Sequence, residues 1–133
     1  MTSNLEASLS AVHDGRMAVS GFLETLFQSR VFVLLDRKPG DDGSWDASAS
    51  PLVLDVPGGA PALALFTSLD RAIRWKDQAP AHPHASSAEF AWLVRGVRSD
   101  IGIAINPGHA LGAEIDPKTT AQMRTFAQRR HQP

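Results

Sequence analysis

Two histidines on either side of a proline, with an aspartate upstream, are the residues of this sequence that most resemble a metal site. His82 and His84 could supply imidazole ligands and Asp77 a carboxylate, a combination that Zn²⁺ accepts. Pro83 keeps the segment extended, however, so the two rings should point to opposite sides of the chain. We therefore expect a solvated loop here, with no metal site and no cofactor.

Nucleophilic catalysis needs a serine, a histidine and an acidic residue in contact, and all three types occur in the chain. Ser29 or Ser68 could combine with His13 or His109, but the sequence contains no Gly-x-Ser-x-Gly turn. Ser68 is better explained as the residue that caps the start of a helix. We therefore expect no catalytic residue, and keep a hydrolase that uses residues 106–109 as an alternative.

Glycine-rich motifs for phosphate are missing as well, since neither Gly-x-x-x-x-Gly-Lys-Ser/Thr nor Gly-x-Gly-x-x-Gly occurs. Gly58 and Gly59 are typical of a hairpin turn. Residues 108–112 form a predicted turn between strands, and its backbone amides could hold an anion. A binder of a small amino-acid-like or anionic metabolite is therefore a second hypothesis.

Tryptophans stand beside charged residues on the predicted helices, which favours a packed ring with one exposed edge. Trp75 and Trp92 have this pattern, whereas Trp45 falls in a predicted loop. Tryptophan is enriched at binding hot spots, so an interface for a partner is the alternative. Any groove should lie near residues 66–68 and 106–109, because ligands gather at the loops that follow strands in α/β sheets. The candidate binding residues are Phe66, Thr67, Ser68, Trp75, Trp92, Asn106, Gly108 and His109.

Composition excludes several classes of function. The chain has 133 residues, with 13 Lys and Arg against 14 Asp and Glu, and therefore a net charge of −1. Such a balance argues against nucleic-acid binding, and the arginines of residues 124–131 are explained as the positive end of a helix. The absence of cysteine excludes disulfides, thiolate metal sites and thiol catalysis.

Signals for export and membrane insertion are also missing. The first ten residues lack the basic and apolar regions of a secretory signal. The longest apolar stretch, residues 31–35, is far below the ~20 residues that cross a bilayer. We therefore expect a cytoplasmic protein with no membrane partner.

The elements that must position the candidate residues follow from hydrophobic spacing and turn residues. We expect a helix that opens at residues 3–6 and ends at Gly15, a helix over 19–27, strands over 31–35, 52–56 and 62–66, helices over 67–75 and 86–97, strands over 101–105 and 113–115, and a last helix that starts at residues 116–117. The order ααβββααββα predicts a single α+β (mixed α/β) domain over residues 1–133. It should contain a mixed sheet of about five strands with helices packed on it.

Four details of these elements are specific enough to test. Val19 is expected on the apolar face of the second helix, and Phe126 on the buried face of the last. Residues 86–89 have the spacing of a capping box, so a helix should open there, and residues 80–84 should be irregular. Residues 101–105 alternate branched and small side chains, which indicates a strand under a closely packed neighbour.

Three segments carry a resemblance when they are taken together. They are Phe22-Leu23-Glu24-Thr25-Leu26 before the strand Val31-Phe32-Val33, Phe66-Thr67-Ser68 before Trp75, and Ile103-Ala104-Ile105-Asn106-Pro107-Gly108 leading through Gly112 to Pro117. Over residues 17–126, their order and spacing resemble the N-terminal domain of the SseB family, bacterial proteins tied by name to enhanced serine sensitivity. The resemblance implies a compact α/β domain with no established enzymatic activity and no catalytic residue to carry over. Some members have a second domain after this one, which we do not expect here.

Taken with the missing catalytic motifs, the resemblance favours a non-catalytic bacterial binding or regulatory module. Its partner should be a protein or a small molecule. An exposed strand edge or an apolar helix face could also join two copies in a homodimer.

Overall fold

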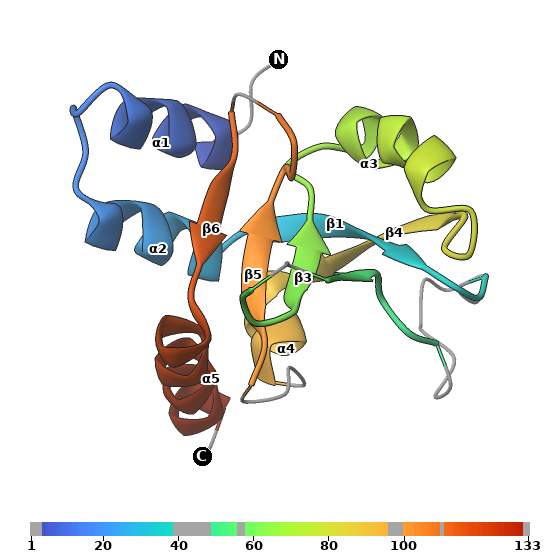
Figure 1. Cartoon of the computed structure of the whole chain (residues 1–133). Helices are drawn as coiled ribbons and strands as arrows, with labels where there is room; N and C mark the ends of the chain where they lie inside the picture. Colours follow the sequence, from blue (N-terminus) through green and yellow to red (C-terminus); the bar gives the residue numbers. More distant parts are fainter. Residues whose placement is uncertain (1–3, 39–48, 56–57, 96–99, 110, 132–133) are drawn as a thin grey trace.

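Strands of two sheets form the centre of the computed structural model, which describes residues 4–38, 49–55, 58–95, 100–109 and 111–131 (Figure 1). The four-stranded sheet has the order β2 (Val53–Leu54), β3 (Ala62–Leu65), β5 (Gly102–Ile105) and β6 (Ala113–Ile115), and the two-stranded sheet pairs β1 (Arg30–Leu35) with β4 (His84–Glu89). β3 and β5 run parallel, whereas the other neighbours run antiparallel. The carboxyl ends of β3 and β5 therefore lie side by side.

β1 connects the two sheets, because it also hydrogen-bonds to the residue that follows β3. Phe32 and Phe66 exchange two backbone hydrogen bonds, with N···O distances of 2.9 and 2.8 Å. The carbonyl of Leu34 accepts from the N–H of Leu52 at 2.8 Å. Figure 1 shows β1 crossing behind β3 and β5. This crossing fixes the point at which the chain leaves the sheet for the next helix.

Helices cover one face of the four-stranded sheet and flank its end (Figure 1). They are α1 (Asn4–His13), α2 (Val19–Phe27), α3 (Leu69–Trp75), α4 (Phe90–Arg95) and α5 (Pro117–His131), with a 3₁₀ turn, η1 (Lys76–Gln78), after α3. Among the described helices, none combines the length and the apolar character that a bilayer span requires.

The start of α5 agrees with its predicted cap. Asp116 Oδ1 accepts the backbone N–H of Thr119 at 2.7 Å, and Pro117 occupies the first helical position. The hydrogen bonds from Thr119 hold the pKa of Asp116 below its ordinary value. The local sequence therefore fixes the point where β6 ends and this helix begins.

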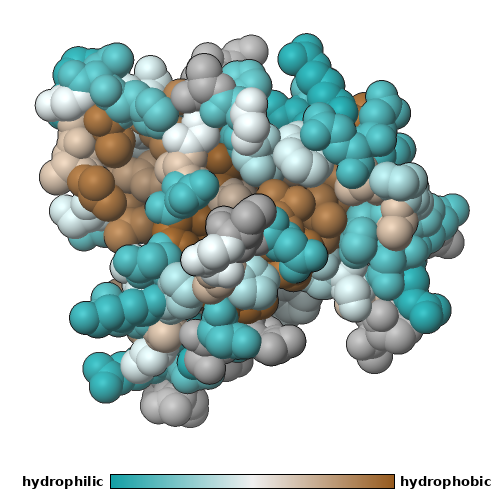
Figure 2. Space-filling view, in the orientation of Figure 1, coloured by the Kyte–Doolittle hydropathy of each residue, from teal (hydrophilic) through white to brown (hydrophobic). Residues whose placement is uncertain are grey.

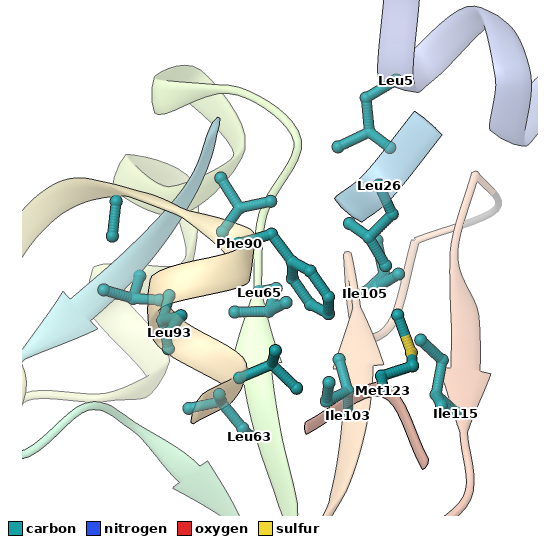
Figure 3. Packing of buried hydrophobic residues seen from close by; sticks show 14 of the residues in the cluster. Leu5, Leu26, Leu63, Leu65, Phe90, Leu93, Ile103, Ile105, Ile115 and Met123 are labelled. Carbon is teal, nitrogen blue, oxygen red and sulfur yellow. The ribbon is translucent and has the colours of Figure 1, made fainter. Parts of the chain in front are cut away.

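Large and small side chains are separated on the two faces of the sheet. The large ones enter the main core, where the side chain of Phe90 lies between the strands and the helices (Figure 3). Those that β3 and β5 contribute to this core are Leu63, Leu65, Ile103 and Ile105. The opposite face carries Ala62, Gly102 and Ala104, and lines a hollow of about 720 Å³. Figure 2 shows apolar surface over β3 and β5 on that face.

The predicted α+β class is confirmed, because the chain combines helices with β-sheets. β4, however, is a strand that the sequence does not predict. Residues predicted to be irregular or to open a helix pair with all six positions of β1, and α4 starts only at Phe90. Ser86 and Ala88 are buried and alternate with more exposed neighbours, as in a strand with one covered face. Pairing with β1 thus outweighs the local capping signal, and the described residues form six strands in two sheets where one sheet of about five was expected.

Two predicted core positions are wrong. Val19 is 60% exposed and Phe126 is 53% exposed. The buried stripe of α5 consists of Thr120, Met123 and Ala127, spaced three and four residues apart. Phe126 lies one position away from this stripe, and therefore on the flank of the helix.

Candidate functional site

Side chains that follow β3 and β5 meet where these parallel strands end. Asn106, directly after β5, is 2% exposed. Its Oδ1 accepts the backbone N–H of Thr67 at 3.0 Å, and its Nδ2 donates to Thr67 Oγ1 at 3.0 Å and to the Leu111 carbonyl at 2.8 Å. One amide group thus ties the end of β3 to both ends of the loop between β5 and β6.

The turn predicted at residues 106–108 is present and has a conformation that needs its residue types. Asn106 has φ 49° and Gly108 has φ 76°, in the left-handed region that asparagine and glycine tolerate best. The N–H of His109 closes the turn on the Asn106 carbonyl at 3.0 Å. The turn therefore holds His109 at a defined place beside the end of β3.

α3 faces this turn because of the way in which it begins. Ser68 Oγ accepts the backbone N–H of Arg71 at 3.3 Å, so Ser68 is the N-cap, as predicted. Seven residues later, Trp75 is half-buried, and its indole N–H donates to the Pro107 carbonyl at 2.8 Å. The cap sets the start of the helix, and the indole ties its end to the turn.

A hollow of about 180 Å³ lies between α3 and the turn, and we call it the α3 hollow. Phe66 and Trp75 line its apolar part, with ring centroids 6.2 Å apart. Arg71, Arg74 and His109 line its polar part. The α3 hollow therefore combines an aromatic wall with a basic rim.

An ion pair supports this rim from the side of α1. Glu6 Oε1 accepts from Thr67 Oγ1 at 2.8 Å and from Arg71 Nε at 3.4 Å, and the side chains of Glu6 and Arg71 are 15% and 21% exposed. Burial alone would raise the pKa of Glu6, but the hydrogen bonds from Thr67 and Arg71 and the charge of Arg71 outweigh it. The pKa of Glu6 is therefore below its ordinary value, and the carboxylate stays charged.

We expect Glu6→Gln to lower the free energy of unfolding by about 1 kcal/mol at pH 7. A carboxyl whose pKa is lowered by folding stabilises the fold above its unfolded pKa, and this contribution is lost as the pH falls through the folded value. The difference between wild type and variant should thus be constant near neutrality and shrink below about pH 4.5. Urea unfolding at a series of pH values measures it. The exposed Glu24→Gln is the matched control, and identical curves for Glu6→Gln and wild type at every pH would contradict the role of Glu6.

Seven of the eight predicted binding residues come together at this end of the sheet. Five of them line the α3 hollow: Phe66, Trp75, Asn106, Gly108 and His109. The other two, Thr67 and Ser68, bond to residues that line it, namely Asn106 and Arg71. That these residues bind a ligand stays a prediction.

Trp92, the eighth predicted residue, lies apart from the others. It is 47% exposed on α4 and lines a different hollow of about 410 Å³, together with Phe27, Arg30 and Arg95. Trp45 lies outside the described residues.

The sequence did not point to Glu6, Arg71 or Arg74 as site residues. Arg71 and Arg74 follow the capping serine by three and six residues, so their positions on one face of α3 were the available signal. Glu6 instead fits a capping box at the start of α1. Its contact with Arg71, 65 residues away, has no local signal.

The described part of the chain places elsewhere the residues that could have formed a metal site or a nucleophile set. His84 begins β4 instead of lying in a loop, and the described residues contain no group of three His, Asp or Glu side chains that could hold a metal. Ser29 Oγ donates to the Thr25 carbonyl at 2.6 Å, and His13 Nε2 lies 2.7 Å from the Gly112 carbonyl. Ser29 therefore makes a contact within its own chain segment, and His13 contacts the loop between β5 and β6.

One family model, described as the SseB protein N-terminal domain, matches residues 5–122 of the chain. No curated protein and no solved structure matches it.

Proposed function

The chain belongs to the SseB family, since the model of that family's N-terminal domain matches residues 5–122, and from this premise we propose that it is a non-catalytic binding module whose ligand enters the α3 hollow. The convergence of aromatic, cationic and turn residues on one hollow is the observation that carries the proposal. Binding sites are typically concave, mostly apolar and equipped with a few fixed polar groups. A bacterial setting is part of the proposal and rests on the family resemblance, and the cytoplasmic location stays a prediction.

The hydroxyl groups beside the α3 hollow support binding over catalysis. Thr67 is 5% exposed, and its Oγ1 donates to Glu6 and accepts from Asn106. A general base works best with a pKa near the working pH, whereas the pKa of Glu6 is lowered. Ser68 Oγ accepts the backbone N–H of Arg71 at the start of α3, and the imidazole of His109 contacts the guanidinium of Arg71. The hydroxyls and the carboxylate thus hold the scaffold of the site.

We expect a fragment that binds this domain to shift the NMR signals of the Trp75 indole N–H and the Gly108 amide. Trp75→Phe should weaken its binding about fivefold, because phenylalanine keeps an apolar wall but loses one hydrogen bond to the turn, worth about 1 kcal/mol. Fragment titration by ¹H–¹⁵N NMR measures both effects.

Trp92→Phe is the matched control and should bind as the wild type does, because Trp92 lines the other hollow. Fragments that shift only the Trp92 signal would place the binding site elsewhere. Chemical conversion of a bound fragment during the titration would contradict a non-catalytic module.

A further inference from the structure

Hydrogen-bond donors meet on the imidazole of His109 without enough acceptors to match them. The backbone N–H of Leu111 points at Nδ1 from 3.1 Å. Arg71 Nη1 lies 2.7 Å from Nε2 and 3.1 Å from Nδ1. A guanidinium has only donors, and a neutral imidazole has one accepting nitrogen and one N–H.

Arg71 Nη1 is close to both ring nitrogens at once, so it lies against the face of the imidazole, where neither nitrogen directs its hydrogen or its lone pair. With Nδ1 accepting from Leu111, the ring hydrogen sits on Nε2 and points outward in the plane of the ring. With the ring hydrogen on Nδ1 instead, that hydrogen points toward the Leu111 N–H, so that a donor faces a donor. The first form keeps the backbone of the turn satisfied, and no described residue then accepts from His109 Nε2, which lies beside Arg71 Nη1 at the exposed edge of the α3 hollow.

We infer that the α3 hollow binds an anionic oxygen group, the carboxylate or phosphate of a small ligand, between Arg71 and His109. One oxygen about 2.8 Å from both nitrogens would accept hydrogen bonds from His109 Nε2 and from Arg71 Nη1. The inference names the ligand class of the site proposed above, and it rests on that proposal.

The charges around the α3 hollow fit an anion. Glu6 pairs with Arg71 through Nε, so Nη1 of the same guanidinium is turned toward His109. Arg74 also lines the hollow and forms no ion pair with any described residue. Its positive charge therefore remains to be balanced, and a planar guanidinium is well suited to carboxylate and phosphate groups. The rest of the ligand would lie against the wall of Phe66 and Trp75.

Titration of the full chain with inorganic phosphate and with acetate, followed by NMR, tests the inference. The readouts are the ring nitrogens of His109, in long-range ¹H–¹⁵N spectra, and the amides of Gly108 and Leu111. In the free protein, we expect the ring hydrogen on Nε2. Saturable shifts at these groups are expected with at least one anion, and the anion that binds more tightly identifies phosphate or carboxylate as the preferred group.

The variants His109→Ala and Arg74→Gln should each weaken anion binding about tenfold, since the first removes a donor and the second a charge from the rim. Arg129→Gln removes the same charge from the exposed last turn of α5, on the opposite side of Figure 1, and should leave binding unchanged. Equal weakening by Arg129→Gln and Arg74→Gln would reveal unspecific charge attraction and overturn the inference.

The anion inference and the proposed function fail in different ways. If neither anion shifts the His109, Gly108 or Leu111 signals while neutral fragments still shift the Trp75 indole, the anion inference is overturned and the binding module stands. If neither anions nor fragments shift any of these signals, both are overturned.

Discussion

Asn106→Ala is expected to lower the free energy of unfolding by about 4 kcal/mol. The substitution removes three hydrogen bonds from a side chain that is 2% exposed. It also leaves the N–H of Thr67 and the carbonyl of Leu111 without the partner that the amide supplied, and a buried polar group without a partner costs about 1–3 kcal/mol. The φ of 49° at this position adds to the loss, because alanine adopts the left-handed region less readily than asparagine does.

Urea unfolding, followed by circular dichroism, measures the effect of Asn106→Ala. Gln78→Ala is the matched control, because it removes an exposed amide that lines the same hollow and should change stability by less than about 0.5 kcal/mol. A loss below about 1 kcal/mol for Asn106→Ala would show that the amide does not join the two strand ends. Any Asn106→Ala that remains folded should also bind fragments less tightly, because His109 is then no longer held beside α3.

The local parts of the site could be predicted from the sequence. The cap at Ser68, the turn at residues 106–108 and the cap at Asp116 depend on residues within four positions of each other, and all three are present. The rule that ligands gather after strands also placed the predicted groove at the end where the α3 hollow lies. In each case the signal lies in residue types that favour one backbone conformation.

The contacts that complete the site join distant parts of the chain and have no such signal. Asn106 meets Thr67 across 39 residues, and Glu6 meets Arg71 across 65. β4 shows the same limit, because its pairing with β1 overrides a segment whose letters fit a capping box. Whether a residue at the edge of a helix face is buried also depends on which elements pack against that helix. Phe126 therefore fits the apolar pattern of the sequence and is nevertheless exposed on the flank of α5.

Gly102→Ala is expected to lower the free energy of unfolding by about 3 kcal/mol, as overpacking against a rigid neighbour does. A Cβ at this position would lie 2.5 Å from the backbone oxygen of Ile115 and 3.5 Å from Pro117 Cδ. The main obstacle is backbone, so β5 and β6 would have to separate. From the sequence, the small residues of β5 predicted a closely packed neighbour. The close approach of β6 to Gly102 explains why a small residue is needed there.

Gly58→Ala separates this crowding from backbone strain. Gly58 has φ 76°, and a Cβ there meets nothing within 4 Å, so alanine should cost only about 1 kcal/mol. Thermal and urea unfolding of both variants measure the difference, and equal losses would show that β6 does not approach β5 this closely. Because β5 and β6 hold the two ends of the loop that carries His109, Gly102→Ala should also displace that imidazole from Arg71. Its anion binding should then fall together with its stability, whereas Gly58→Ala should lose stability alone.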